Sequence, residues 1–181
     1  MFSKFLRKLV GSTSTDKRRY QDRYFDNLHA RFEIYNEITE SFNTKYFDIL
    51  ELMESRTSDS DERRYEYIDQ ILNLIKETKL ELKLVPSSLD APISVERIFN
   101  EGVERLIKAF ELKECSYEIQ RTLYKNLIML NENSGDIEKL NTINENLLEL
   151  PEDEDYMETS HKHEMAFLKC YEQAINIIYK E

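Results

Sequence analysis

The sequence predicts an all-α protein: an antiparallel bundle of five or six helices, with a long first core helix and a short amphipathic helix at the N-terminus. Two observations lead to this fold class. The 181 residues include only three glycines and three prolines, the residues that sheets and loop-built sites need at tight turns. Apolar residues also recur at steps of three and four, which places them along one side of each helix. An antiparallel bundle is the simplest way to bury several such one-sided stripes.

The long first core helix is predicted from Asp16, which can cap it, to about Ser55. Its stripe is formed by Tyr20, Tyr24, Leu28, Phe32, Tyr35, Ile38, Phe42, Tyr46, Ile49 and Met53. The residues before it, from Gly11 on, are small and polar and are typical of a linker. The chain therefore divides into an amphipathic basic helix at 1–11, a linker at 12–15 and a single helical-bundle domain at 16–181.

The second helix follows a polar stretch at 55–61, in which Ser60 is one of three candidate capping residues. Pro86 and Pro92 bracket the one extended connection, because proline removes the backbone donor that a helix needs. The third helix begins shortly after Pro92. Its apolar stripe slips out of phase around residues 113–116, so we expect a bend or a short break there.

Two more helices complete the bundle. The turn at 131–135 ends the third helix, and a shorter helix with an apolar stripe from Ile137 to Leu148 leads to Pro151. After an acidic loop, the last helix carries its stripe from Met165 to Tyr179. We expect all of these stripes to be buried against one another.

Charge is unevenly distributed along the chain, whose net charge is −11. Residues 1–31 hold eight basic and three acidic side chains, whereas the rest of the chain is strongly acidic. An acidic body repels nucleic acid, so direct nucleic-acid binding is not expected, while a basic beginning attracts anionic partners. The oligomeric state cannot be read from the sequence.

Cellular location is predicted from cysteine usage and hydropathy. Cys115 and Cys170 form no CxxC pair, and we interpret them as reduced thiols in the helical core of a protein in a reducing compartment. No apolar run approaches the roughly 18 residues that a spanning helix needs. The expected location is the cytoplasm, with peripheral contact at the inner membrane surface through the N-terminal helix.

The N-terminal helix is the first candidate site, for contact with an anionic membrane surface or with a partner. On a helical wheel, Phe2, Phe5, Leu6, Leu9 and Val10 fall on one side and the basic residues on the other, the pattern of an interfacial helix. The predicted contact residues are Phe2, Phe5, Leu6, Leu9, Lys4, Arg7 and Lys8. Two other interpretations stay open: packing on the chain's own bundle, and a mitochondrial transit peptide.

The acidic segment around Pro151 is the second candidate site, a docking surface for a protein partner of unknown identity. It concentrates negative charge, and Tyr156 and Met157 would supply an apolar anchor. The docking residues are Glu152, Asp153, Glu154, Asp155 and Tyr156. The same carboxylates could instead stand in for phosphates, which makes an acidic nucleic-acid mimic an alternative function.

Catalytic motifs are not found, so the sequence predicts neither an enzyme nor a bound cofactor. Asp26 and His29, and likewise Glu158 and His161, are spaced one helical turn apart, as in di-iron bundles, but neither pair completes a metal site. A cryptic metal-dependent helical-bundle enzyme remains an alternative. The function expected is that of a non-enzymatic helical interaction protein: an adaptor, a regulator or an immunity-type inhibitor.

Overall fold

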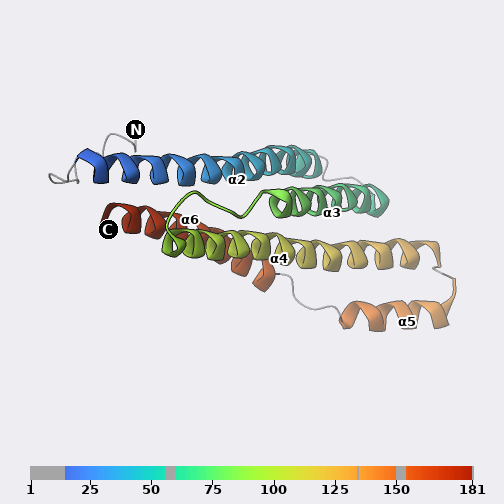
Figure 1. The fold of residues 1–181 in the computed structure, drawn as a ribbon. Coiled ribbons are helices and arrows are strands. Elements are labelled where there is room, and N and C mark those ends of the chain that lie inside the picture. The colour runs from blue at the N-terminus through green and yellow to red at the C-terminus, as the bar shows by residue number, and fades with distance from the viewer. Residues whose placement is uncertain (1–14, 56–59, 134, 150–153, 181) are drawn as a thin grey trace.

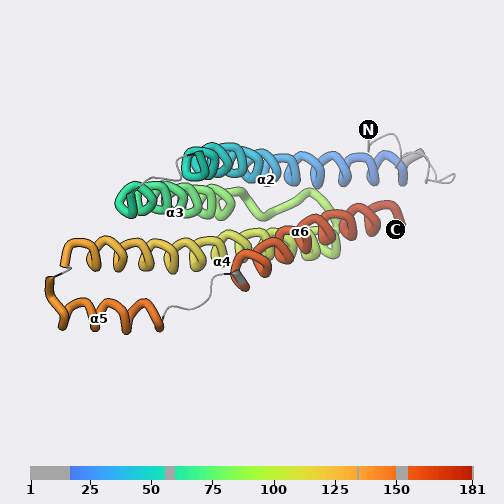
Figure 2. Tube along the Cα trace, turned by 180° about the vertical axis from the view of Figure 1, so that it is seen from behind, coloured from blue at the N-terminus to red at the C-terminus, as the bar shows by residue number. Residues whose placement is uncertain are grey.

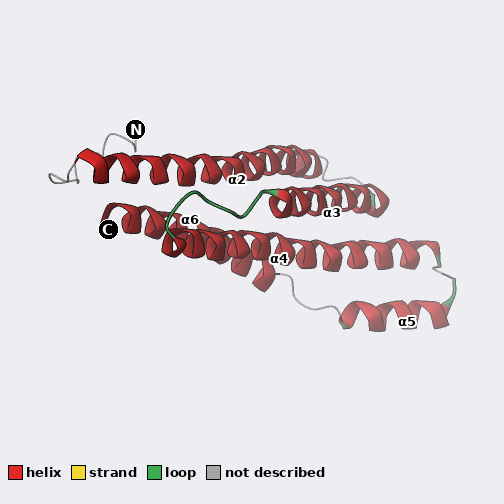
Figure 3. Cartoon of the chain, in the orientation of Figure 1, coloured by secondary structure: helices red, strands yellow, loops and turns green. Residues whose placement is uncertain are grey.

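The computed structural model describes residues 15–55, 60–133, 135–149 and 154–180, and all regular secondary structure within these ranges is helical (Figures 1 and 3). Its elements are α2 (Thr15–Ser55), α3 (Asp61–Leu84), α4 (Ile93–Glu132), α5 (Ile137–Leu148) and α6 (Glu154–Lys180). The all-α prediction is confirmed. The short helix expected at 1–11 lies outside the described residues, and α2 already includes Thr15 and Asp16, where a linker end and a cap were expected.

Side-chain contacts fix the relative directions of α2, α4 and α6. Ring contacts between α2 and α4 advance together along both helices: Tyr35–Phe99, Phe42–Phe110 and Tyr46–Tyr117. Along α6, in contrast, Ser160 contacts Ala109 whereas the later Cys170 faces the earlier Gly102. Thus α2 and α4 run parallel and α6 runs antiparallel to both, as both views show (Figures 1 and 2).

The core lies between α2, α3, α4 and α6. Its largest fully buried side chains are Phe42, Phe99, Phe110, Leu28, Ile68, Ile71, Leu72, Ile75, Leu82, Leu106 and Val95. Most of them occupy the predicted apolar stripes, because a helix that presents one apolar side must cover it with neighbouring helices. The stripe spacing therefore identified most of the core side chains before their partners were known.

Local capping fixes where α3 and α5 begin. The Ser60 side chain accepts a hydrogen bond from the backbone N–H of Arg63, and Asp136 does the same for Lys139. Such caps satisfy amides that the first helical turn leaves without partners. The hydrogen bond from the backbone N–H of Lys139, together with the positive charge of the Lys139 side chain, lowers the pKa of the Asp136 carboxyl.

The connection between α3 and α4 is extended, as its two prolines predicted, and it lies against α2. Arg23 forms an ion pair with Asp90, and Arg31 donates to the Ser88 carbonyl at 3.2 Å. The backbone N–H of Leu89 donates to Glu96 at 3.3 Å. These contacts hold the connection across the first half of α2 and use part of the basic charge of that helix.

Helices α4 and α6 approach each other closely at Gly102. A Cβ atom placed there would lie 2.7 Å from the Cβ of Cys170 and 3.3 Å from the Phe167 ring. Along the same interface, the buried Ser160 hydroxyl donates to the Ala109 carbonyl at 2.9 Å. Small side chains therefore let the two backbones come together.

The short break expected as one possibility at residues 113–116 is wrong, because α4 is one continuous helix of 40 residues. Lys113 and Ser116 lie on the core side of α4. The spacing of apolar residues in the sequence is therefore interrupted there, although the buried side of the helix is continuous. The Lys113 side chain is only 13% exposed and pairs with Glu164 at 2.6 Å. Its ammonium also lies over the Phe42 ring, 5.4 Å from the centroid.

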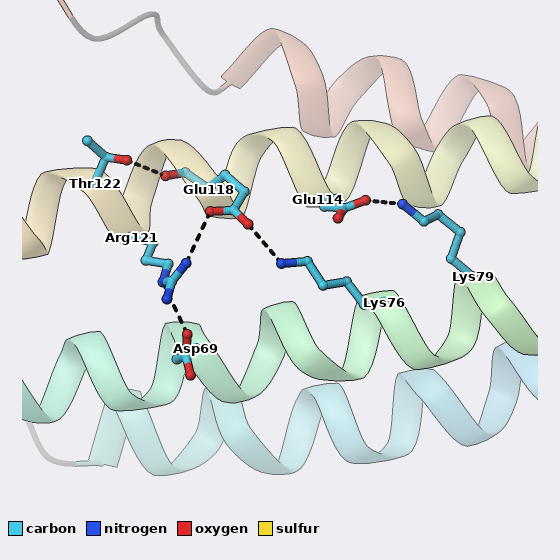
Figure 4. Close-up of polar contacts among 7 residues, drawn as sticks. All are labelled: Asp69, Lys76, Lys79, Glu114, Glu118, Arg121 and Thr122. Carbon is cyan, nitrogen blue, oxygen red and sulfur yellow. Dashed lines mark hydrogen bonds and ion pairs between the residues drawn. The ribbon is translucent and has the colours of Figure 1, made fainter.

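A row of ion pairs joins α3 to α4 (Figure 4). Lys76 contacts Glu118 at 2.9 Å, Lys79 contacts Glu114, Lys83 lies 3.8 Å from Glu111, and Arg121 lies 3.1 Å from Asp69. Most of these side chains are more than a third exposed, so each pair contributes only about 0–1 kcal/mol. Lysine residues of α3 face glutamates of α4 along most of the row, and the signs reverse at Asp69 and Arg121.

Candidate interaction surfaces

The predicted N-terminal contact residues, namely Phe2, Phe5, Leu6, Leu9, Lys4, Arg7 and Lys8, lie outside the described residues. The chain that follows them keeps its basic character at the surface. Lys17, Arg18 and Arg19 at the start of α2 are all exposed and form no ion pair with another described residue. These three basic residues, unpaired within the described part of the chain, lie at the end of the bundle where α6 also ends (Figure 1).

The predicted acidic docking surface is described only in part. Glu152 and Asp153 lie outside the described residues, and Glu154 is the first residue of α6. Asp155 is exposed and Tyr156 is half-buried. Met157, which was expected to be an exposed apolar anchor, instead packs against the core. Tyr156 and Met157 are both half-buried, and the anchor role expected of them stays a prediction.

The two carboxylate–histidine pairs do not come together as a metal site. The contacts of the His29 Nδ1 atom are with the Tyr171 hydroxyl at 2.8 Å and with Glu33 at 3.8 Å, and not with Asp26, its expected partner. His161 lies 3.7 Å from Glu164. Across the described residues, no group of three or more His, Cys, Asp or Glu side chains is placed to hold a metal ion.

An aromatic seam between α2 and α6 holds the most perturbed described tyrosine. Tyr171 stacks on Phe32 with ring centroids 3.9 Å apart and contacts His29 at its hydroxyl. Burial, assisted by the negative charge of Glu33, raises the pKa of Tyr171 to about 12. A phenol with so high a pKa stays protonated at neutral pH, so the seam acts in packing and hydrogen bonding.

The cysteines differ in environment and are both free. Cys115 is exposed, so its expected place in the core is wrong. Cys170 is partly buried at the α4–α6 crossing, and burial raises the pKa of its thiol. A raised pKa lowers the fraction of reactive thiolate, which indicates a packing role for Cys170.

The largest departure from the sequence prediction is the surface formed by α5 and residues 119–132 of α4, which we call the arm. Of the other described helices, α5 contacts only α4. Only Ile143 of its apolar residues is buried, whereas Leu140 and Leu147 are half-buried. Ile137 is 75% exposed and Leu148 is 86% exposed. The expectation that this stripe is buried in the bundle is therefore wrong.

Apolar side chains that are half-buried or exposed lie on both helices of the arm. On α5 the apolar arc is about 140° wide, and Ile143, at one edge, is the part that faces α4. On α4, half-buried apolar residues recur at steps of four, four and three and do not join the main core: Ile119, Leu123, Leu127 and Leu130. We call these four residues, with Ile137, Leu140, Leu147 and Leu148, the arm strip.

Carboxylates flank the α5 part of the arm strip on one side. Glu138, Glu145 and Glu149 of α5 are exposed, and none of them forms an ion pair with another described residue. Lys139 is the basic residue of α5, and it is paired with Asp136 at 3.4 Å. The arm strip is therefore an apolar surface with a negative rim on one side. It is followed in the chain by the acidic segment around Pro151 that was predicted as a docking surface.

The arm strip was missed because the apolar spacing of residues 137–148 is that of any buried amphipathic helix. Spacing alone does not show whether a covering element exists. The signal that could have found it is the position of α5, a short helix between a turn and a proline at the end of a long partner.

Membrane-spanning helices are not found among the described residues, since none is both long and apolar enough. No family model, curated protein or solved structure matches this chain.

Proposed function

We propose that this chain is a non-enzymatic helical interaction protein that acts as an adaptor, a regulator or an immunity-type inhibitor. The single observation that carries the proposal is the arm strip. Isolated apolar residues on a surface need no explanation, whereas several uncovered apolar residues on one side of a helix, with acidic residues beside them, are typical of a protein-binding surface. The bundle then serves to hold α4, and with it the arm, in place.

The proposed partner contact combines apolar burial with charge. Removing the arm strip from water would supply the affinity, because the free energy gained scales with the apolar area that is buried. The carboxylate rim and the neighbouring acidic segment with Tyr156 would select a positively charged partner and speed its association. Asp155 lies at the start of α6, where it would extend the same negative field.

We further propose that residues 1–11 form a sixth, short amphipathic helix joined to the bundle by a linker at 12–15. This helix would localise the chain to the inner surface of an anionic membrane. Exposed Lys17, Arg18 and Arg19 support this part of the proposal, because each basic residue near such a surface adds about 1 kcal/mol of attraction. The acidic body would be held away from the same surface.

Site-specific photo-crosslinking in the native host tests the partner contact. A crosslinking residue at Leu148 should capture a defined protein, while one at Leu84 should not. Leu84 is a matched control because it is 71% exposed but lies on α3, outside the arm. Identical crosslinking patterns from the two positions would contradict the proposal.

Co-sedimentation with vesicles that contain anionic lipid tests the localisation. The full chain should pellet with the vesicles, and a variant that lacks residues 1–11 should remain in the supernatant. Equal pelleting of the two proteins would remove the membrane role and leave the arm proposal intact.

A further inference from the structure

The arm strip needs an occupant, and the chain itself contains a segment with complementary chemistry. We infer that residues 2–10 of a second copy of this chain dock on the arm strip. This inference rests on the proposed role of the arm as an interaction surface. It names the partner that occupies that surface in the absence of a membrane.

The apolar side of the segment has the spacing required for helix-in-groove recognition. Phe2, Phe5, Leu6 and Leu9 stand at positions i, i+3, i+4 and i+7, the anchor pattern of amphipathic helices that bind apolar grooves. As a helix, residues 2–10 would be about 13 Å long, and α5 is about 18 Å long. The segment therefore fits along the exposed side of α5.

Charge selects this occupant over a second arm. Lys4, Arg7 and Lys8 lie opposite the apolar side of the segment, while Glu138, Glu145 and Glu149 form the unpaired rim of the arm strip. The basic segment and the acidic α5 carry opposite net charge and therefore attract each other. Two arms brought face to face would instead place acidic rims against each other, and like charges at an interface are unfavourable.

Chain reach excludes docking on the same molecule. Leu9 can lie at most about 22 Å from Thr15, even along a fully extended backbone. Tyr46, whose ring contacts Tyr117 at the near edge of the arm, lies about 46 Å from Thr15 along α2. Only a fully extended segment would bring Phe2 that far, and extension would remove its one-sided apolar face. The two ends also lie far apart in both views (Figures 1 and 2).

The resulting assembly is head-to-tail, because each copy offers a segment at one end and an arm at the other. A dimer formed by such a contact still has one unoccupied segment and one unoccupied arm. Assemblies therefore grow into chains or rings as concentration rises. Membrane binding would bury the same apolar side of residues 2–10. Assembly and membrane contact therefore exclude each other for a given copy.

Sedimentation equilibrium on full-length variants tests the inference. The unmodified chain should show a weight-average mass that rises with concentration beyond that of a dimer. Both the double variant Phe5→Glu, Leu6→Glu and the arm variant Leu148→Lys should remain monomeric. Leu84→Lys, an equally exposed leucine outside the arm, should assemble like the unmodified chain.

Mixing the two defective variants gives the decisive result. Phe5→Glu, Leu6→Glu retains an intact arm and Leu148→Lys retains an intact segment, so the mixture should form a one-to-one heterodimer and stop there. A monomeric unmodified chain, no heterodimer, or equal loss of assembly in Leu84→Lys would overturn the inference. Capture of a host protein at Leu148 would still support the proposed function, so the two failures are distinguishable.

Discussion

Gly102 sets the distance between α4 and α6, and replacing it by alanine is the most direct test of this packing. The new Cβ would lie 2.7 Å from the Cβ of Cys170. Neither atom can move by side-chain rotation, since each is fixed to a helix backbone. Relief therefore requires α6 to shift away from α4 along the most extensive helix–helix contact in the described structure.

Two opposing effects determine the magnitude. Alanine is favoured over glycine inside a helix by about 1 kcal/mol. Overpacking an interior costs about 1–3 kcal/mol, and a contact between two fixed atoms belongs in the upper part of that range. We expect Gly102→Ala to lower the free energy of unfolding by about 1–2 kcal/mol, because the packing cost exceeds the helix-propensity gain.

Thermal and urea unfolding followed by circular dichroism would measure the change. For a chain of this size, each kcal/mol shifts Tm by about 2–4 °C, so a decrease of about 2–8 °C is expected. Gly135→Ala is the control, because nothing lies within 4 Å of a Cβ at that glycine and its φ is not positive.

Second substitutions at Cys170 identify the atoms responsible. Cys170→Ala keeps the Cβ and should not relieve Gly102→Ala, whereas Cys170→Gly removes it and should restore part of the lost stability in a double-mutant cycle. A Gly102→Ala protein as stable as the parent, or equal rescue by both second substitutions, would refute the close approach of α4 and α6.

Three further outcomes are expected. Ser160→Ala removes the buried hydrogen bond to the Ala109 carbonyl and should lower the free energy of unfolding by about 1 kcal/mol in urea titrations; an unchanged midpoint would contradict that bond. Ile143→Ala should abolish hydrogen-exchange protection in residues 137–148 while leaving the protection of α4 near Phe110 unchanged, because Ile143 is the one buried side chain of α5; equal loss in both helices would contradict a separate arm. Tyr171 should ionise near pH 12 in a titration of tyrosine absorbance; since its folded pKa lies above the unfolded value of about 10, its stabilising contribution should be complete below pH 10 and lost as the pH rises towards 12, and Tyr171→Phe should reduce this loss.

The fold class and most core residues could be predicted because they depend on local chemistry. Apolar spacing identified Leu28 and Phe42, Ser60 was one of three residues expected to cap α3, and Pro86 and Pro92 marked the extended connection. Each of these signals acts within a few residues along the chain.

The errors arose where tertiary contacts decide. Lys113 is a charged residue on the buried side of α4, with its ammonium over the Phe42 and Phe110 rings, and long cationic side chains can cover apolar surface in this way. The sequence alone could not show that Met157 faces the core or that Leu148 faces solvent, because both depend on which neighbouring helix is present. The amphipathic helix at residues 2–10 and the docking role of the acidic residues 152–153 remain predictions.

The reversal of sign in the row of ion pairs between α3 and α4 has a consequence for how the two helices meet. If α3 slid along α4 by one turn, about 5.4 Å, Lys76 would move towards Arg121 in one direction, and Asp69 towards Glu118 in the other. Repeating leucines and isoleucines tolerate such a slide better, since one turn replaces one apolar side chain with another. The exposed charges add little to stability but disfavour misaligned hairpins, so neutralising Asp69 and Arg121 together would broaden the set of alignments sampled during folding.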